Sequence, residues 1–335
     1  MTKTITYESP SNIALIKYWG KHGNQLPNNP SISFTLSKSK SITSIEYAKE
    51  KSRIEFYFEN KRNLAFEERV KRFILNNKEI LPFINDYSLK ISSKNTFPHS
   101  AGIASSASAF SALSACLISI KQELGYQVLD FKKEVSNLAR LGSGSACRSV
   151  YKGVVLWGKT DLINSSSNKF AIPINNQVHD VFTNYHDDII IVEDSQKSVS
   201  SSTGHNLMDT NPFRYEKYKQ SNINLENLLI ALKDGDLNQF IKIVENEALS
   251  LHSMMMLSEP SFILLKPKTL EVINDIRRYR NKTKIPVCFT LDAGPNIHLL
   301  YPNKYHAEIQ EFKSKIKKVS IITDSLGNGI KNIVK

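Results

Sequence analysis

The 335-residue sequence predicts an α+β fold of two domains, residues 1–183 and 184–335. Segments with the two-residue period of β-strands dominate the first half and are followed by helical patterns, whereas strands and helices alternate in the second half. This order favours two α+β domains over a doubly wound parallel sheet. The serine-rich stretch at 164–168 is typical of a loop and supports a boundary near residue 180.

Alternating apolar and polar residues predict the strands of the first domain. These strands lie at 3–8, 31–36, 41–47, 53–58, 87–93 and 154–157. Apolar residues recur at helical spacing over 64–77, 104–124 and 131–140. The middle helix also carries many Ala and Ser residues, so we expect it to be buried on more than one side, and Gly125 is a suitable terminator.

The second domain is predicted to begin with the apolar strand 189–192. Helices are expected at 223–234, 237–256, 268–280 and 303–316, and strands at 285–291, 297–301 and 319–323. His252 and the three methionines at 254–256 lie on a helical pattern, and we interpret them as core packing.

The composition is that of a protein with a full core, since 41% of its residues are hydrophobic and 9% are aromatic. No window approaches the roughly 20 apolar residues that a membrane span needs. The first ten residues lack the apolar run of a signal peptide. Three widely separated cysteines form neither a metal-binding spacing nor a disulfide framework. We therefore expect a cytoplasmic protein without a membrane partner.

The formal net charge of +12 raises the question of nucleic-acid binding, which is the alternative from a different functional class. Most lysines alternate with acidic residues, and the densest basic run, 313–318, is typical of a solvated helix face. No nucleic-acid recognition motif is present. A basic protein also attracts small polyanions, so we expect no nucleic-acid partner.

Two glycine- and serine-rich loops flank the helix at 104–124 and provide the strongest functional signal. The first covers 97–107 and contains Ser105 and Ser106; the second covers 142–149. Small residues let backbone N–H groups approach an anion, and a helix N-terminus adds about half a positive charge. Helix capping explains one serine but not Gly102 and both hydroxyls, so we predict a phosphate site. The Gly-Lys-Ser/Thr ending of a Walker loop is missing.

Further charged side chains are candidates for chemistry. Arg148 ends the second loop and could clamp a carboxylate or phosphate bidentately, with a surface ion pair as the alternative. Asp292 follows an apolar strand and precedes a Gly-Pro turn, so it is either a strand-tip carboxylate or a cap of that turn. Lys17 and Lys21 lie beside Tyr18 in a segment that we predict as strand followed by loop, although exposed lysines are usually only solvated.

Segment 98–106 resembles the phosphate-binding signature of the GHMP small-molecule kinase superfamily. Within that superfamily, the chain closely resembles the mevalonate diphosphate decarboxylases. Matching blocks follow in order along nearly the whole chain, at 12–21, 31–36, 93–106, 142–149, 292–296 and, more weakly, 199–201. The sequences Lys-Tyr-Trp-Gly-Lys and Gly-Ser-Gly-Ser-Ala-Cys-Arg-Ser within these blocks are highly specific.

This resemblance implies a two-domain GHMP-kinase-like fold with the active site in the cleft between the domains. It also implies ATP and Mg²⁺ as cosubstrates, mevalonate 5-diphosphate as the substrate, and a homodimer. ATP would phosphorylate the tertiary hydroxyl, and phosphate would then leave as the carboxylate is lost. The products would be isopentenyl diphosphate, carbon dioxide, ADP and phosphate.

The resemblance also implies roles for residues on the substrate side. Asp292 would act as base or orienting carboxylate for the tertiary hydroxyl, Arg148 would hold the substrate carboxylate, and Lys17 would neutralise developing negative charge. The phosphates of the substrate would be bound by Tyr18, Lys21, Ser143, Ser145 and Ser200.

On the nucleotide side, Ser105, Ser106 and the backbone from Gly102 would hold the ATP phosphates, with Ser106 nearest the transferred group. Ser93 and Asn95 match the block that lies on the same side. No protein side chains are predicted as a dedicated metal site.

Some positions depart from the family pattern and leave alternatives open. Lys152 replaces a glycine that is common in the family, and His205 stands where methionine is frequent. The segment around Ser202 lacks an arginine that some bacterial relatives carry, so a phosphomevalonate decarboxylase acting on the 5-monophosphate is one alternative. A GHMP kinase that does not decarboxylate is another, although the joint presence of the lysine, arginine and aspartate named above argues against it.

Overall fold

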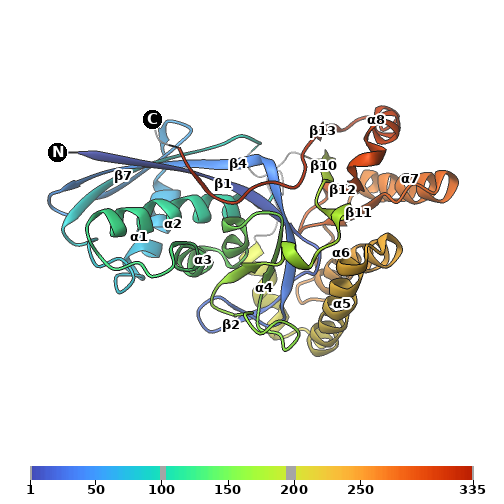
Figure 1. Ribbon diagram of the computed structural model, residues 1–335, viewed down its shortest axis with the longest axis horizontal. Helices are drawn as coiled ribbons and strands as arrows, with labels where there is room; N and C mark the ends of the chain where they lie inside the picture. The colour runs from blue at the N-terminus through green and yellow to red at the C-terminus, as the bar shows by residue number, and fades with distance from the viewer. Residues whose placement is uncertain (1, 99–102, 194–200, 334–335) are drawn as a thin grey trace.

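The structure is a computed structural model that describes residues 2–98, 103–193 and 201–333. Two β-sheets follow one another along the length of the molecule (Figure 1). Helices α1 (Leu64–Leu75), α2 (Ser105–Glu123) and α3 (Phe131–Gly142) accompany the larger sheet. Helices α5 (Arg214–Asp234), α6 (Leu237–Met256), α7 (Pro267–Thr283) and α8 (His306–Ser314) accompany the smaller one. The expected α+β class is therefore confirmed.

The larger sheet has the strand order β14-β1-β4-β7-β5-β6, with β8 and β9 extending from β4. Its bounds are β1 (Lys3–Ala14), β4 (Ser31–Lys49), β5 (Ile54–Phe58), β6 (Lys61–Arg62), β7 (Tyr87–Asn95), β8 (Val154–Trp157), β9 (Ala171–Pro173) and β14 (Lys331–Asn332). Of the described strand pairs in this sheet, β5 with β7 is parallel and the others are antiparallel. Strand β14, near the C-terminal end of the described residues, pairs with β1.

Strand β4 corrects the prediction of two separate strands at 31–36 and 41–47. The intervening residues, Ser-Lys-Ser-Lys, interrupt the apolar alternation but remain extended. The backbone N–H groups of 37–39 donate to the carboxylate of Asp324 at 2.7–2.9 Å, while Lys40 pairs with Pro10 of β1. A distant carboxylate thus completes hydrogen bonding that local sequence could not reveal.

Helix α2 packs against β1 and β4 and is buried along most of its length, as its Ala- and Ser-rich composition predicts. It ends at Glu123, Leu124 is the C-cap residue, and Gly125 follows with φ +84°, a conformation that suits glycine. Its N-terminus at Ser105 belongs to the first serine loop, so the buried helix fixes this end of the loop against the larger sheet.

The smaller sheet is antiparallel in the order β11-β12-β10-β13. Its strands are β10 (Tyr185–Ile191), β11 (Cys288–Leu291), β12 (Ile297–Pro302) and β13 (Ser320–Ile322). Helix α5 begins at Arg214, whereas the sequence predicted a start at 223. The first turns bury the polar side chains of Lys217 and Ser221, so they lack the apolar period from which the helix was predicted. The remaining predicted strands and helices lie close to their expected positions.

Elements too short for pattern analysis complete the described chain. The structure adds the hairpin of β2 (Lys21–His22) and β3 (Leu26–Pro27) and the short helix α4 (Ser201–Asn206). One hydrophobic core contains Phe34 from β4 together with Phe182, Tyr185 and Phe240. Aromatic side chains from both halves of the chain therefore pack together, and this contact orients the two sheets.

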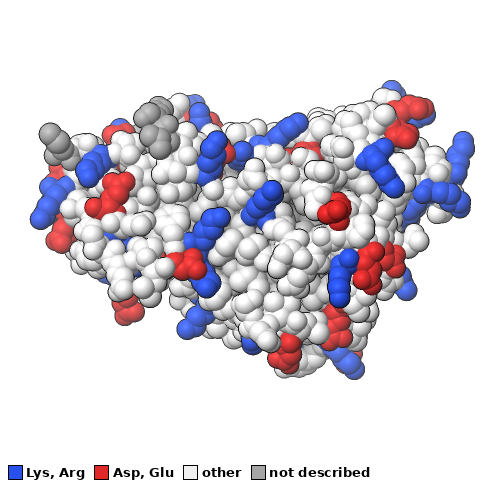
Figure 2. All heavy atoms as spheres, in the orientation of Figure 1, with Lys and Arg blue, Asp and Glu red and all other residues white. Residues whose placement is uncertain are grey.

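The basic run 313–318 is not wholly the solvated face that we expected. Helix α8 ends at Ser314, and Lys313 is buried with its Nζ against the carboxylate of Asp188 at 2.5 Å. On the face in Figure 2, Lys and Arg side chains are scattered among acidic ones. Within the described ranges, none of the helices has the length and apolarity that a bilayer crossing would require.

Candidate active site

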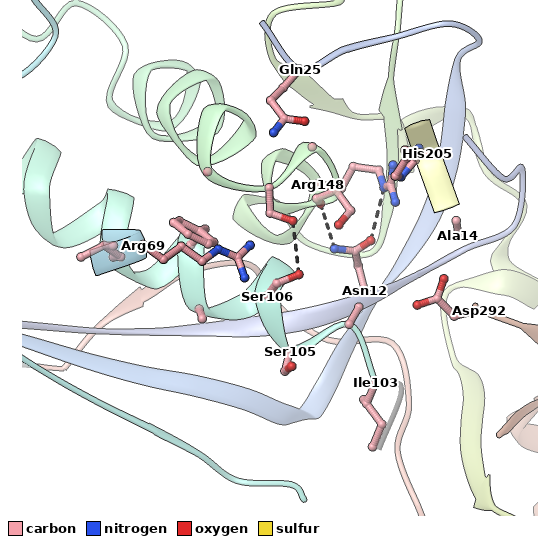
Figure 3. Close-up of a pocket in the computed structure, with 18 of the residues that line it drawn as sticks. Asn12, Ala14, Gln25, Arg69, Ile103, Ser105, Ser106, Arg148, His205 and Asp292 are labelled. Atoms are coloured by element: carbon pink, nitrogen blue, oxygen red, sulfur yellow. Dashed lines mark hydrogen bonds between the residues drawn. The ribbon is translucent and has the colours of Figure 1, made fainter. Parts of the chain in front are cut away.

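A cavity of about 540 Å³ gathers every predicted site residue that the structure describes. Its walls come from the end of β1 and the loop after it, from β7, from the start of α2, from the second serine loop and from the turn after β11 (Figure 3). The residues are Lys17, Tyr18, Lys21, Ser93, Asn95, Ser105, Ser106, Ser143, Ser145, Arg148 and Asp292. Gly102 and Ser200 lie outside the described residues.

The two serine loops meet at the N-terminus of α2. The residue before the helix is Ala104, with φ +46° and no side-chain hydrogen bond that caps the helix. Ser105 and Ser106 therefore line the cavity rather than act as the cap. The hydroxyl of Ser106 lies 3.3 Å from that of Ser143 (Figure 3). An uncapped helix N-terminus between hydroxyls is suited to an anionic group.

The second loop closes tightly around an aromatic pair. Helix α3 runs to Gly142, and a 3₁₀ helix, Gly144–Val150, follows. A Cβ on Gly144 would collide with the hydroxyl of Tyr18 and crowd the ring of Trp157. Those two rings meet edge to face, with centroids 4.8 Å apart. Glycine at 144 thus lets the loop backbone reach Tyr18.

Arg148 is a buried cation and not part of a surface ion pair. Its side chain is only 2% exposed, and its Nε donates to Oδ1 of Asn12 at 3.3 Å. The guanidinium carbon lies 5.8 Å from the ring centres of both Tyr18 and Trp157. Nη1 has no hydrogen-bond partner among the described residues, and burial lowers the pKa of Arg148. A buried donor without an acceptor indicates that a ligand supplies the acceptor.

Lys17 is likewise buried rather than solvated. Its Nζ donates to the main-chain oxygen of Ala14 at 2.5 Å, and the residue is 2% exposed. Burial lowers the pKa of Lys17 to about 8, while the nearby negative charges of Asp292 and Glu247 oppose that decrease. The ammonium therefore sits where its charge is poorly solvated and where it attracts anions.

Asp292 stands at the tip of β11, as the sequence predicts. It is half-buried, lines the cavity, and its carboxylate points towards Asn12 in Figure 3. Its main-chain oxygen accepts bonds from the N–H of Gly294 at 2.8 Å and from Nε2 of His252 at 3.1 Å. His252 is buried in α6 as expected, but it also holds the Asp292 backbone, a contact that its sequence position did not reveal.

His205 is placed at the cavity by its two aromatic neighbours. Its ring lies 4.4 Å from that of Tyr18 and 4.6 Å from that of Trp19. Nδ1 accepts the N–H of Gly20 at 3.0 Å, so the ring proton resides on Nε2. Burial lowers the pKa of His205 to about 3, with the charge of Lys21 adding to the decrease. The sequence singled out this position without assigning its role.

Sequence reasoning missed an apolar wall of the cavity and the arginine within it. The wall consists of Phe56, Phe58, Phe66, Val70 and Phe110. Arg69 lies in this wall, with its guanidinium carbon 4.9 Å from the ring centre of Phe110. The available signal was an arginine on the apolar face of α1, at helical spacing from Phe66 and Phe73.

The described part of the chain shows no cluster of side chains that would bind a metal ion. Among residues 2–98, 103–193 and 201–333, no group of three or more His, Cys, Asp or Glu side chains could hold a metal ion. The three cysteines are free and buried.

Comparisons with known proteins identify the family of the chain. Residues 9–169 match the family model described as the diphosphomevalonate decarboxylase-like N-terminal domain. Residues 188–331 match the mevalonate 5-diphosphate decarboxylase C-terminal domain. The diphosphomevalonate decarboxylase of Ganoderma lucidum is 32% identical over 328 residues, which cover 91% of this chain and 80% of the relative. The diphosphomevalonate decarboxylase of Saccharomyces cerevisiae is 28% identical over 334 residues, which cover 93% of this chain and 81% of that relative.

Solved structures agree in fold over the entire chain. The mevalonate diphosphate decarboxylase of Staphylococcus aureus gives a TM-score of 0.86 at 27% identity, covering 100% of this chain and 99% of that one. A structure described as MDDEF in complex with MVAPP, AMPPCP and magnesium gives 0.85 at 28% identity, covering 100% of both chains. These matches confirm the two-domain GHMP-kinase-like fold that the resemblance implied. The chain belongs to the diphosphomevalonate decarboxylase family.

Proposed function

We propose that this chain phosphorylates mevalonate 5-diphosphate at its tertiary hydroxyl with ATP and then decarboxylates it. The observation that carries the proposal is one cavity in which a buried arginine with an open Nη1 faces the same space as Lys17, Asp292 and two serine loops. Carboxylate, hydroxyl and phosphate groups of one substrate each find a matching group there.

ATP would occupy the half of the cavity at the start of α2. Ser105 and Ser106 would bind its phosphates with the helix N-terminus, and Ser93 and Asn95 would lie beside them. The apolar wall of phenylalanines offers a surface for the adenine ring, and Arg69 adds positive charge beside it. Gly102 remains a prediction at the same loop.

Magnesium fits this arrangement as a companion of ATP. Mg²⁺ commonly binds through substrate phosphates, water and one or two protein oxygens, so a dedicated cluster of protein ligands is not required. Ser106 at the helix start is the described hydroxyl that we assign to it. The ion would neutralise charge on the transferred phosphoryl group.

The substrate would occupy the other half of the cavity. Arg148 would bind its carboxylate through Nη1, and Asp292 would accept or orient the hydroxyl proton. Lys17 would stabilise the negative charge that develops on the departing phosphate. The diphosphate would be bound by Tyr18, Lys21, Ser143 and Ser145, which line the cavity. Ser200, which lies outside the described residues, is predicted from the sequence to bind it as well.

The reaction then follows in two steps. The tertiary oxygen attacks the γ-phosphorus of ATP, its proton goes to Asp292, and ADP leaves. The bond between the tertiary carbon and the phosphorylated oxygen breaks, and phosphate departs with that electron pair. The bond to the carboxylate carbon also breaks, carbon dioxide leaves, and that electron pair forms the alkene of isopentenyl diphosphate. Arg148 would align the carboxylate with the breaking carbon–oxygen bond.

A coupled ADP-release assay tests the substrate. Mevalonate carrying zero, one or two phosphates would be supplied with MgATP, and alkene formation would be measured in parallel. A monophosphate leaves donors near Lys21 without a charged partner, and each lost charge-assisted bond is worth about 1.5–3 kcal/mol, or roughly tenfold or more in rate. We expect a clear preference for the diphosphate. Equal or better turnover of the monophosphate would replace this proposal with the monophosphate alternative.

We also propose a domain division, an oligomeric state and a cellular location for this chain. The domains would be residues 1–183 and 184–335, a division that the break between the two sheets near β10 supports.

A homodimer is supported by large apolar side chains exposed on or beside α5, such as Phe213, Tyr215 and Ile230. Three free cysteines support a reducing, cytoplasmic environment. Sedimentation analysis at several protein concentrations would test the dimer.

A further inference from the structure

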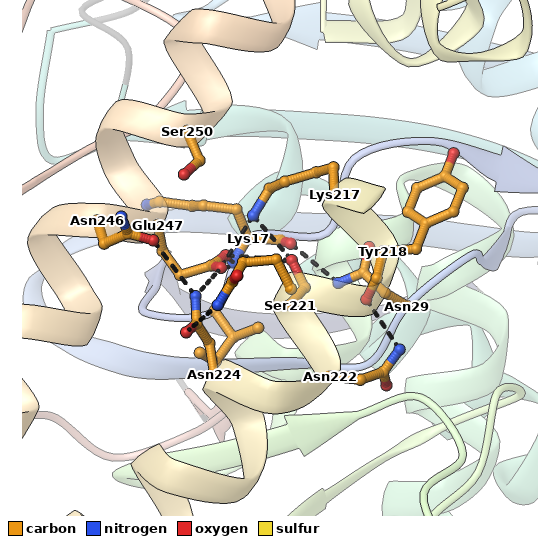
Figure 4. Close-up of polar contacts among 12 residues, drawn as sticks. Lys17, Asn29, Lys217, Tyr218, Ser221, Asn222, Asn224, Asn246, Glu247 and Ser250 are labelled. Atoms are coloured by element: carbon orange, nitrogen blue, oxygen red, sulfur yellow. Dashed lines mark hydrogen bonds and ion pairs between the residues drawn. The ribbon is translucent and has the colours of Figure 1, made fainter. Parts of the chain in front are cut away.

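Glu247 of α6 is a carboxylate with no exposed surface that is surrounded by hydrogen-bond donors. Its Oε1 accepts bonds from Nζ of Lys217 at 2.9 Å and from Nδ2 of Asn224 at 2.7 Å. The hydroxyl of Ser221, also on α5, lies 3.3 Å from the same oxygen. Its Oε2 accepts the backbone N–H of Lys17 at 2.9 Å (Figure 4). Glu247 therefore joins both long helices to the cavity wall.

The backbone of Lys17 is held at both of its polar atoms. Glu247 accepts its N–H, and Nδ2 of Asn29 donates to its main-chain oxygen at 3.0 Å. The side chain leaves this anchored backbone, and Nζ reaches the main-chain oxygen of Ala14. Small movements of the backbone at residue 17 would consequently displace the ammonium from the cavity wall.

Stability alone is a poor explanation for this network. Removing two opposite charges from water is costly, and a buried ion pair is often no more stabilising than apolar side chains of similar volume. The network is better explained by the geometry that it imposes, because one oxygen of Glu247 binds Lys217 and the other binds the backbone N–H of Lys17.

We propose that Glu247 is a positioning residue that, with Lys217 as counter-ion, fixes the Lys17 backbone and provides the Lys17 ammonium with a negative neighbour. This inference rests on the proposed function of Lys17 in neutralising the departing phosphate. Glu247 itself lies outside the set of residues that line the cavity, so it acts through Lys17.

The charge of Glu247 affects the pKa of Lys17, an effect that a purely structural role of Glu247 in packing would not have. The charges of Asp292, Glu247, Asp187 and Arg148 act on the Lys17 ammonium. Burial is the main cause of its lowered pKa; the three carboxylates raise that pKa and Arg148 lowers it. Removing the charge of Glu247 would therefore lower the pKa of Lys17 further, so its ammonium would lose its proton at a lower pH.

The experiment compares Glu247→Gln with a matched control on the same helix. Glu245 is also buried, at 6% exposure, but its carboxylate pairs with Arg277 and Arg280 of α7. Glu245→Gln removes an equally charged group from a buried ion-paired site without touching Lys17. In Glu247→Gln, the new amide N–H₂ must face a donor, so contact with Lys17 or Lys217 is lost.

For Glu247→Gln, we expect kcat at least about tenfold below wild type, since misplacement of a charged group weakens transition-state stabilisation. The alkaline limb of kcat/KM should shift to lower pH by roughly half a unit or more. KM for ATP should stay within about twofold, because the ATP contacts are untouched. Glu245→Gln should lower the melting temperature and leave both kinetic readouts at wild-type values. Equal losses in both variants, or an unmoved limb in Glu247→Gln, would overturn the proposal.

Two additional measurements separate this proposal from the proposed function. If the wild-type protein does not turn over mevalonate 5-diphosphate, the proposed function fails, and an NMR titration of labelled lysines then decides the coupling. The Lys17 resonance, assigned by its loss in Lys17→Met, should titrate at lower pH in Glu247→Gln than in Glu245→Gln; identical titrations would refute the coupling. If Glu247→Gln does not fold, Asn224→Ala replaces it: kcat at least about threefold lower supports positioning, and wild-type kcat rejects it.

Discussion

Oδ1 of Asn12 accepts a hydrogen bond from Nε of Arg148 at 3.3 Å, so an amide from β1 orients the buried guanidinium of the second serine loop. Nδ2 of Asn12 donates to the main-chain oxygen of Ser145 at 3.1 Å and to the hydroxyl of Ser149 at 2.7 Å. Asn12 therefore fixes both the loop and its arginine. Nη1 of that arginine is left without a partner among the described residues.

Arg148→Lys should accordingly be a severe change. Lysine has no planar fork that could bond to both Asn12 and a carboxylate, so alignment of the substrate is lost. We expect decarboxylation to fall at least ~100-fold and phosphorylated substrate to accumulate beside isopentenyl diphosphate. Product analysis by phosphorus NMR would reveal this accumulation. Wild-type kinetics in the lysine variant would contradict the assigned role.

Asp292→Asn should abolish turnover while ATP still binds. The substitution is nearly isosteric, and the main-chain contacts to Gly294 and His252 do not require the carboxylate. Loss of a proton-accepting or orienting group should lower kcat at least ~100-fold. Turnover and nucleotide affinity would be measured on the same preparation. A variant that keeps more than about a tenth of wild-type turnover would exclude this role for Asp292.

The pH dependence of kcat/KM should show an alkaline limb caused by Lys17. The pKa of Lys17 is lowered to about 8, and we assign the active form as the charged ammonium. Activity should therefore be full below that pKa and decline as the pH rises through it. Lys17→Arg retains the charge at all these pH values, so its lower activity should lack this limb. Persistence of the limb in the arginine variant would assign it to another group.

Asp324→Asn should destabilise the fold without changing the cavity. The Asp324 carboxylate accepts backbone N–H groups of 37–39 and of Ser325, and the residue is 1% exposed. An amide N–H₂ would oppose at least one of these donors, so we expect a loss of about 2–4 kcal/mol in the free energy of unfolding. Urea denaturation measures the loss, and Asp86→Asn, at an exposed site, is the control. Unchanged stability would mean that water replaces the carboxylate.

The sequence by itself determined the α+β class, most helices and strands, and the polar residues of the two serine loops, β7, the segment after β1 and the turn after β11 that meet in the cavity. Helix α2 was predictable because its period and its small residues lie within one continuous segment. The serine loops, Arg148 and Asp292 were predictable because anion binding and proton transfer require particular residue types within short motifs.

Only the tertiary structure decided the features in which polar groups are satisfied by distant partners. The continuity of β4 depends on Asp324, and the early start of α5 depends on Glu247, which pairs with the buried Lys217. Arg69 became visible as a cavity residue only once α1 lay beside Phe110. Sequence periodicity reports which face of an element is apolar, whereas the partner of a buried charge is chosen by packing between segments far apart in the chain.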